Sequence, residues 1–401
     1  MIKVIDAIPG SGKSHNIFKL MRHYQDECKF IYITPFLSEI EERVPKELPE
    51  MDFKNPSNKG EGKLSDFKTL ALNDENIAST HALFGMFTPE IVDILIEKQY
   101  VLIIDEALQC IGLVDEGLNQ SDVFALLESE MVSVNKEDRY KVEWNEEKYP
   151  EHSGKYAAVR NMAHMGCLYC FEDKFLMFEY PPKLLAELDN IYILTYLFQG
   201  SSMRCWLDIN KIPWNYLDTE AMGIRPEEEV KSIIRKNLQI ISNRSLDKIQ
   251  QTDTSLSSTW FKNSPASDVT QYRRIMRSLV VSNKAKAGQI FWTTYKKYKE
   301  KLEHDGFRKG VSPDMPAFLP LNTRATNKYK DYSFCMYAVN LYLNPVDLRY
   351  MRSQGVEPDL DTYALSEMLQ FIWRGAIRQG KPMKVVVLSK RMRKLLEEWL
   401  K

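Results

Sequence analysis

The sequence predicts an α/β fold built on parallel sheets, and three observations support this prediction. Short apolar runs typical of buried strands recur along the chain, and segments with helix-like spacing of apolar residues lie between them. The first run leads directly into a glycine-rich turn. Strands that alternate with helices are typical of βαβ units, whose strands run parallel. In the first half of the chain the strand-like runs cover residues 3–7, 30–34, 100–105 and 190–196.

The second half of the chain repeats this alternation from about residue 206, with strand-like runs at 289–293 and 383–388. Between about 116 and 186 the pattern loosens into a charged stretch, followed by two short strands within 168–180 joined by Glu172-Asp173-Lys174. We therefore expect a first domain over residues 1–205, with an insertion at about 116–186, and a second domain over residues 206–401.

Composition and charge exclude several classes of protein. With 54 Lys and Arg against 55 Asp and Glu, the formal net charge is −1, which excludes a histone-like protein that binds nucleic acid by bulk charge. A local basic cleft stays possible. No apolar run approaches the roughly 20 residues of a membrane span, and the six cysteines are unevenly spaced, as in proteins of reducing compartments. The sequence therefore predicts a cytoplasmic protein with no membrane partner.

The turn after the first strand matches a phosphate-binding loop. Residues 7–14 read Ala-Ile-Pro-Gly-Ser-Gly-Lys-Ser, with Ala7 in place of the usual first glycine. Glycines allow the backbone N–H groups to point at phosphate, and the following helix adds its positive N-terminus. The alternative is a chance Gly/Ser turn. The expected nucleotide contacts come from Pro9, Gly10, Ser11, Gly12, Lys13 and Ser14, with Lys13 on the β- and γ-phosphates and Ser14 on Mg²⁺.

The second motif is a pair of acidic residues, Asp105 and Glu106, at the end of the strand-like run at residues 101–106. Asp105 stands at the carboxyl end of this buried strand, where α/β sheets bind ligands, and is expected to hold Mg²⁺. Glu106 is expected to act as general base toward the attacking water. The alternative is that Asp105 caps a helix that begins at Glu106.

The two motifs together resemble the first RecA-like domain of superfamily 1 and 2 (DEAD-like) helicases, and further segments resemble helicase motifs in the same order. The closest resemblance is to compact ATP-dependent helicases encoded by bacteriophages, and it covers about residues 7–378. The matching segments are Thr34-Pro35, Thr80-His81, residues 193–196 and 291–295, Arg324 with Thr326 and Asn327, and Gln370 with Arg374 and Arg378.

The resemblance implies two tandem RecA-like domains that bind ATP and Mg²⁺ between them, move along a single strand and unwind duplex. DNA is expected as the partner rather than RNA, the motor is expected to act as a monomer, and a phage-encoded protein would work in the host cytoplasm. The implied nucleic-acid contacts are Thr34, Pro35, Thr80, His81, Arg324, Thr326 and Asn327.

The helicase-like segment near the C-terminus is expected to supply arginine fingers. If residues 365–378 form one helix, Gln370, Arg374 and Arg378 fall on one polar face, opposite an apolar face. This face would contact nucleotide through Gln370, with Arg374 and Arg378 as catalytic fingers. Glu367 shares the polar face without a proposed contact, so its removal is expected to be silent. Removal of Lys13 is expected to abolish turnover without changing stability, because the loop faces the surface.

Two other functions stay open from the residues alone. A terminase-like DNA-packaging motor would share the front half, and a nucleotide-gated interaction module would bind ATP without unwinding. Lys296–Lys299 and Lys328–Lys330 alternate bases with aromatics, as single-strand tracks do, although solvated surface is the alternative. The basic cluster at Arg273, Arg274 and Arg277 is interpreted as surface. Cys167 and Cys170 are interpreted as buried thiols rather than zinc ligands, because a second pair is missing.

Overall fold

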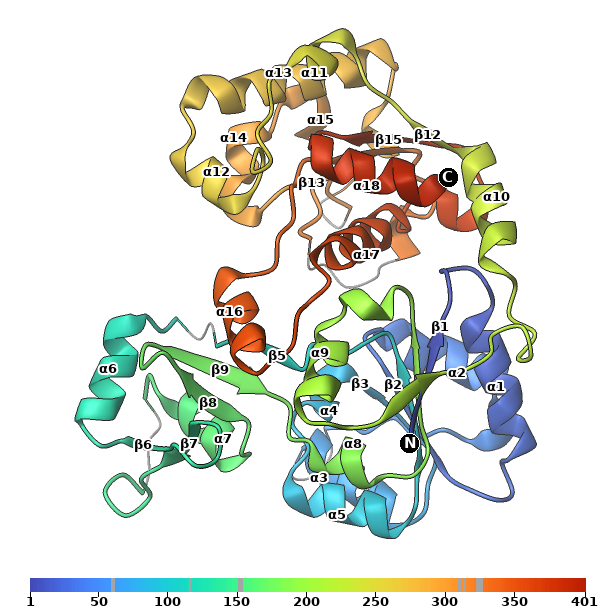
Figure 1. Ribbon diagram of the computed structural model, residues 1–401. Coiled ribbons are helices and arrows are strands. Elements are labelled where there is room, and N and C mark those ends of the chain that lie inside the picture. The colour runs from blue at the N-terminus through green and yellow to red at the C-terminus, as the bar shows by residue number, and fades with distance from the viewer. Residues whose placement is uncertain are drawn as a thin grey trace. The chain divides into compact units, whose positions relative to one another are not determined.

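The computed structural model describes residues 1–58, 62–114, 117–150, 154–308, 310, 312, 315–321 and 327–401 (Figure 1). Contacts within the chain divide it into two units. The first unit contains residues 1–6, 13–218 and 344–358, and the second contains 7–12, 219–343 and 359–401. The segment 344–358 thus belongs to the first unit, although the sequence analysis assigned it to the second domain.

The first unit is built on a six-stranded parallel sheet in the order β11-β1-β10-β4-β2-β3. All residues of β2, β4 and β10 are buried, because helices cover both faces of a parallel sheet. Since the strands are parallel, their carboxyl ends meet at one edge, where Asp105 and Thr195 are the last residues of neighbouring strands. The strands are β1 (Ile2–Asp6), β2 (Phe30–Thr34), β3 (Ile77–Thr80), β4 (Val101–Asp105), β10 (Ile191–Thr195) and β11 (Trp214–Tyr216).

The helices of this unit begin at recognisable capping residues. Thr88 accepts a hydrogen bond from the Ile91 N–H at 3.4 Å and precedes Pro89 at the first helical position, as in many helix starts. The helices are α1 (Lys13–His23), α2 (Val44–Glu47), α3 (Lys63–Leu72), α4 (His81–Phe84), α5 (Pro89–Glu97), α8 (Lys183–Glu187) and α9 (Ser202–Ile209), with the π-helical η1 (Glu39–Arg43) and the short 3-10 helices η2 (Pro49–Met51) and η3 (Phe198–Gly200).

The insertion forms a separate antiparallel sheet in the order β5-β9-β8-β7-β6. Glu172 and Asp173 both have positive φ, at 53° and 51°, which is the geometry of a tight hairpin turn. The predicted pair of strands around Glu172-Asp173-Lys174 is therefore confirmed. The elements are β5 (Ile111–Leu113), α6 (Gln120–Glu128), β6 (Val132–Asn135), β7 (Lys141–Trp144), α7 (Ala157–His164), β8 (Leu168–Phe171) and β9 (Phe175–Glu179).

Helix α16 (Pro345–Ser353) packs on this antiparallel sheet, although it lies more than 160 residues further along the chain. The Leu113 N–H donates to Asp347 Oδ1 at 2.8 Å. Glu179, only 1% exposed, accepts hydrogen bonds from the Tyr350 hydroxyl at 2.5 Å and from Arg139 Nη2 at 2.7 Å. A buried carboxylate needs such partners, because leaving it unpaired costs several kcal/mol.

The second unit has a four-stranded parallel sheet in the order β12-β15-β14-β13, with its own apolar core. The strands are β12 (Leu238–Ile240), β13 (Ile290–Thr293), β14 (Phe334–Tyr337) and β15 (Met383–Val387). The helices are α10 (Glu227–Asn237), α11 (Arg244–Lys248), α12 (Ser258–Asn263), α13 (Ala266–Ser282), α14 (Lys299–Leu302), α15 (Asp305–Arg308), α17 (Leu360–Ile372) and α18 (Lys390–Leu400), with turns η4 (Ala287–Gln289), η5 (Lys296–Tyr298), η6 (Asn327–Tyr329) and η7 (Ala376–Gln379).

The predicted α/β class with parallel sheets flanked by helices is confirmed in both units. Each run predicted as a strand in residues 3–7, 30–34, 100–105 and 190–196 lies in the first parallel sheet. Among the described residues, none of the helices combines the length and the apolar character that a bilayer crossing requires.

Candidate nucleotide site

The turn between β1 and α1 has the backbone of a phosphate-binding loop. Gly10 and Gly12 have φ of +84° and +100°, in the region that favours glycine. The Ser11 N–H donates to the Ile8 carbonyl at 3.1 Å, which tightens the turn. The Ser11 hydroxyl is buried and has no hydrogen-bond partner among the described atoms. A buried polar group without a partner is costly, and a bound phosphate oxygen would satisfy it.

Lys13 is the first residue of α1 and is only 8% exposed. Its Nζ donates to the Thr195 carbonyl, at the end of β10, at 2.8 Å. Burial lowers the pKa of Lys13, while the nearby carboxylates of Glu106, Asp105 and Asp6 act in the opposite direction. The expectation that the loop faces the surface is therefore wrong for Lys13, and its removal would take away one of the two cations, Lys13 and Arg43, that lower the pKa of the buried Asp105 carboxyl.

Asp105 ends β4 and is 7% exposed. The Tyr32 hydroxyl, from the neighbouring strand β2, donates to Asp105 Oδ2 at 2.6 Å. Burial raises the pKa of the Asp105 carboxyl, and the Tyr32 hydrogen bond, Lys13 and Arg43 oppose this rise. Tyr32 was not predicted as a site residue. The sequence feature that could have indicated it is its hydroxyl group within an otherwise apolar run.

Glu106 follows β4 with a left-handed backbone, φ +68°. Its N–H donates to the Leu194 carbonyl of β10 at 2.8 Å. Left-handed backbone at a residue other than glycine is uncommon and marks a constrained position. No helix begins at Glu106, since residues 107–110 are irregular and β5 follows, so the alternative that Asp105 caps a helix is wrong.

The residues at this edge fit Mg²⁺ and a nucleotide phosphate. In phosphoryl-transfer sites Mg²⁺ takes one or two protein oxygens and shares the substrate phosphates. The half-buried Ser14 and the Asp105 carboxylate supply that chemistry. Within the described ranges, no group of three or more His, Cys, Asp or Glu could hold a metal by protein ligands alone. Cys167 and Cys170 are buried thiols whose pKa values are raised by burial.

The predicted nucleic-acid contacts in the first unit lie at the same edge and make local contacts. Thr34 is fully buried, and its hydroxyl accepts from the Phe36 N–H at 3.3 Å. Thr80 caps α4, and His81 Nε2 lies 2.9 Å from the Asp105 carbonyl oxygen. Pro35 is half-buried. The nucleic-acid role of these residues stays a prediction, and the burial of Thr34 weighs against it.

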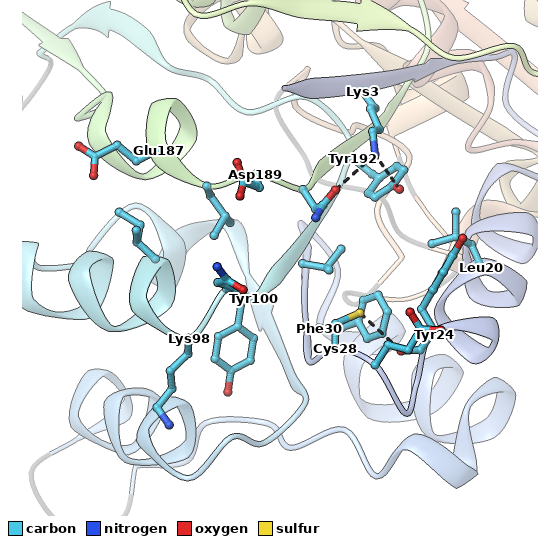
Figure 2. Close-up of a pocket in the computed structure, with 16 residues that line it drawn as sticks. Lys3, Leu20, Tyr24, Cys28, Phe30, Lys98, Tyr100, Glu187, Asp189 and Tyr192 are labelled. Carbon is cyan, nitrogen blue, oxygen red and sulfur yellow. Dashed lines mark hydrogen bonds between the residues drawn. The ribbon is translucent and has the colours of Figure 1, made fainter.

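A cavity of about 620 Å³ lies at the opposite edge of the same sheet (Figure 2). It is lined by residues at the amino ends of the strands, and parallel sheets bind ligands at their carboxyl ends. Several of its polar groups already contact one another. Lys3 Nζ donates to Asn190 Oδ1 at 3.4 Å and to the Tyr192 hydroxyl at 3.2 Å. Lys98, also in the lining, pairs at 2.8 Å with Asp74, which lies outside the lining. We therefore place the candidate site at the carboxyl edge.

In the second unit, the predicted helix over residues 365–378 is confirmed as far as Ile372 and is wrong beyond it. Helix α17 ends at Ile372, and Arg374 lies in the turn beyond it. Gly375, three residues after the end of the helix, lies at a crowded point, because a Cβ at this position would lie 2.7 Å from Met383 Sδ and 2.9 Å from Phe291 Cε1. The chain needs a residue without a side chain to pass this closely over the sheet.

The two predicted finger arginines have different surroundings. Arg374 is 8% exposed, donates from Nη2 to the Leu321 carbonyl at 3.3 Å, and lies over the Phe371 ring. Burial lowers its pKa, and Glu367 opposes this. Arg378 is exposed in η7, and Gln370 is exposed on α17. The shared polar face that was predicted for Gln370, Arg374 and Arg378 does not exist.

Glu367 is not the silent surface residue that was expected. Burial raises the pKa of its carboxyl, and Arg374 acts in the opposite direction, so the two side chains interact electrostatically. Arg324 and Thr326 lie outside the described residues, and only the backbone of Asn327, the first residue of η6, is described.

Comparison with known proteins identifies the family. The chain is 30% identical over 417 aligned positions to the SPbeta prophage-derived uncharacterized protein YonV of Bacillus subtilis (strain 168), covering 100% of this chain and 98% of that protein. The chain belongs to the YonV family. The YonV C-terminal Rossmann-like domain matches residues 232–400, and the YonV middle domain matches residues 115–178.

The solved structures show a helicase-like fold for this YonV-family chain. A structure titled XPD_Helicase matches with a TM-score of 0.54 at 14% sequence identity, covering 99% of this chain and 94% of that one. At this identity the likeness concerns the fold, and it agrees with two RecA-like domains. The YonV middle domain covers the antiparallel sheet except for β5 and the last residue of β9, and the YonV C-terminal domain includes the second parallel sheet.

Proposed function

We propose that this YonV-family protein is an ATP-dependent motor that moves along single-stranded DNA and unwinds duplex. The observation that carries the proposal is the carboxyl edge of the first sheet. Lys13, Asp105 and Glu106 gather there, and in the sequence Lys13 directly follows a phosphate-binding turn with an unsatisfied Ser11 hydroxyl. The helicase-like fold supports the same class of protein.

Each residue at this edge has a distinct task in the proposal. When ATP binds, Lys13 Nζ gives up its hydrogen bond to the Thr195 carbonyl and donates to phosphate oxygens instead. Asp105, fixed by the Tyr32 hydroxyl, and Ser14 would hold Mg²⁺, which would supply positive charge next to the phosphates. Glu106 receives the proton of the attacking water.

The role of Arg374 and Arg378 as arginine fingers stays a prediction within this proposal. Arg378 suits the task better than Arg374, because Arg378 is exposed while Arg374 is held inside the unit by the Leu321 carbonyl. An arginine finger contributes about 10³–10⁵ to turnover in related reactions. Arg378→Ala should therefore reduce ATP turnover by orders of magnitude and change nucleotide affinity little.

The test is ATP turnover measured without nucleic acid, with single-stranded DNA and with single-stranded RNA. We expect DNA to stimulate turnover and Lys13→Ala to abolish it. The matched control is Lys19→Ala, which removes an exposed lysine from the same helix and should leave turnover unchanged. Turnover that no nucleic acid alters would contradict the motor and favour a nucleotide-gated interaction module. Normal turnover by Lys13→Ala would contradict the nucleotide site itself.

A further inference from the structure

Three arginines lie within five residues on the outer side of α13. Arg274 and Arg277 are exposed, and Arg273 is half-buried. The opposite side of the helix carries Tyr272, Ile275, Met276 and Leu279, which are buried in the core of the second unit. Because this packing fixes the rotation of the helix, the arginines are held at the surface by the fold.

A fourth arginine extends this surface onto the neighbouring helix. Asn243 Nδ2 donates to the Ser278 hydroxyl of α13 at 3.5 Å, and the exposed Arg244 follows directly as the first residue of α11. Figure 1 shows α11 and α13 close together in the second unit. We call Arg244, Arg273, Arg274 and Arg277 the α13 basic face.

The α13 basic face has no anionic partner within the part of the chain that the structure describes. None of its four arginines forms an ion pair there, whereas the exposed Arg349 and Arg352 each bind a carboxylate through two nitrogens. The nearby Asp247 pairs with Arg393 at 3.4 Å and accepts from the Ser242 hydroxyl.

Such a concentration of charge is unfavourable by itself. Like charges four residues apart on a helix, as at Arg273 and Arg277, destabilise it by a few tenths of a kcal/mol. The whole chain has a formal net charge of −1, so the four positive charges reflect local placement and not overall composition. An anionic ligand would turn this repulsion into attraction.

We propose that the α13 basic face binds the phosphate backbone of nucleic acid, without reading sequence. Guanidinium groups suit this ligand, because their planar fork donates two hydrogen bonds to one phosphate. The face lies outside every helicase-like motif of the sequence, so it is a nucleic-acid contact separate from those that the motifs predict. Binding here needs no ATP hydrolysis, and the inference is therefore testable even if the proposed motor function is wrong.

The test is binding of a fluorescent single-stranded DNA to the full chain at several salt concentrations, without nucleotide. In the triple variant Arg273→Glu, Arg274→Glu, Arg277→Glu we expect at least tenfold weaker binding in low salt. The slope of log affinity against log salt should fall by about 2, because each lost phosphate contact on a single strand contributes roughly 0.7. A matching variant with Gln in place of Glu should give the same fall in slope with a smaller loss of affinity.

The matched control changes the net charge equally at other exposed lysines, as Lys19→Glu, Lys211→Glu, Lys236→Glu. It should weaken binding less than threefold and leave the slope unchanged. Equal losses in the two triple variants, or an unchanged slope in the Arg variant with normal thermal unfolding, would overturn the proposal. Because this assay contains no nucleotide, a failed nucleotide site does not change its outcome, whereas a failed basic face does.

Discussion

Replacing Asp347 by Asn should stabilise the protein at neutral pH and much less in acid. Asp347 is 9% exposed, and its Oδ1 accepts from the Leu113 N–H at 2.8 Å. Burial raises the pKa of this carboxyl from 3.8 to about 6. The folded state therefore binds the proton more tightly than the unfolded chain, and stability falls as the pH rises from about 4 to about 6.

The size of the effect follows from the shift in pKa. Two pKa units correspond to about 3 kcal/mol, which is an upper bound because buried carboxyls relax with their surroundings. Asn keeps an oxygen that can accept from the Leu113 N–H and carries no charge. We expect Asp347→Asn to gain about 2 kcal/mol at pH 8, and less than about 1 kcal/mol at pH 4.5, where most of the penalty is absent.

The assay is urea unfolding at both pH values, with hydrogen exchange of the Leu113 amide as a local readout. Asp26→Asn, at an exposed aspartate of the same unit, is the matched control and should stay within about 0.5 kcal/mol. A gain of equal size at both pH values, or a loss at pH 8, would refute the reasoning, since neither can come from the ionisation of Asp347.

Three further predictions concern the two parallel sheets. Tyr32→Phe removes the hydroxyl that lowers the pKa of Asp105, so the acid limb of the pH profile of ATP turnover should move to higher pH; an unchanged profile would exclude this role. Arg374→Ala and Glu367→Gln should each destabilise the second unit, and the double variant should cost less than the sum of both in a double-mutant cycle; strictly additive losses would show that the pair does not interact. Gly375→Ala should cost more than about 2 kcal/mol by thermal unfolding, because its Cβ meets side chains of β13 and β15; a silent change would contradict the close packing.

The elements that could be predicted from the sequence are those with local causes. A buried strand needs a short apolar run, and a phosphate-binding turn needs glycines at fixed positions. A few consecutive residues are therefore enough to predict β4 and the turn before Lys13. The same holds for the hairpin at Glu172-Asp173. These features need no knowledge of what packs against them.

The features that the prediction missed depend on contacts between distant segments. Beyond the end of α17, Gly375 passes close to Met383 and Phe291, and a helical projection of one segment contains no such information. The burial of Lys13 depends on the Thr195 carbonyl, which lies 182 residues away. Helix-period patterns report which face is apolar, but not which residue covers it.

The course of the chain between the two units limits how this protein can be divided. A fragment that ends at Asp218 would lose α16, leaving the Glu179 carboxylate without the Tyr350 hydroxyl and the Leu113 amide without Asp347. A fragment that begins at Thr219 would carry α16 with no sheet beneath it. Gene fusions, domain swaps and expression trials therefore have no clean junction near the middle of this sequence. A recombination event there would separate one unit from a helix on which its folding depends, so the two halves are expected to be inherited together.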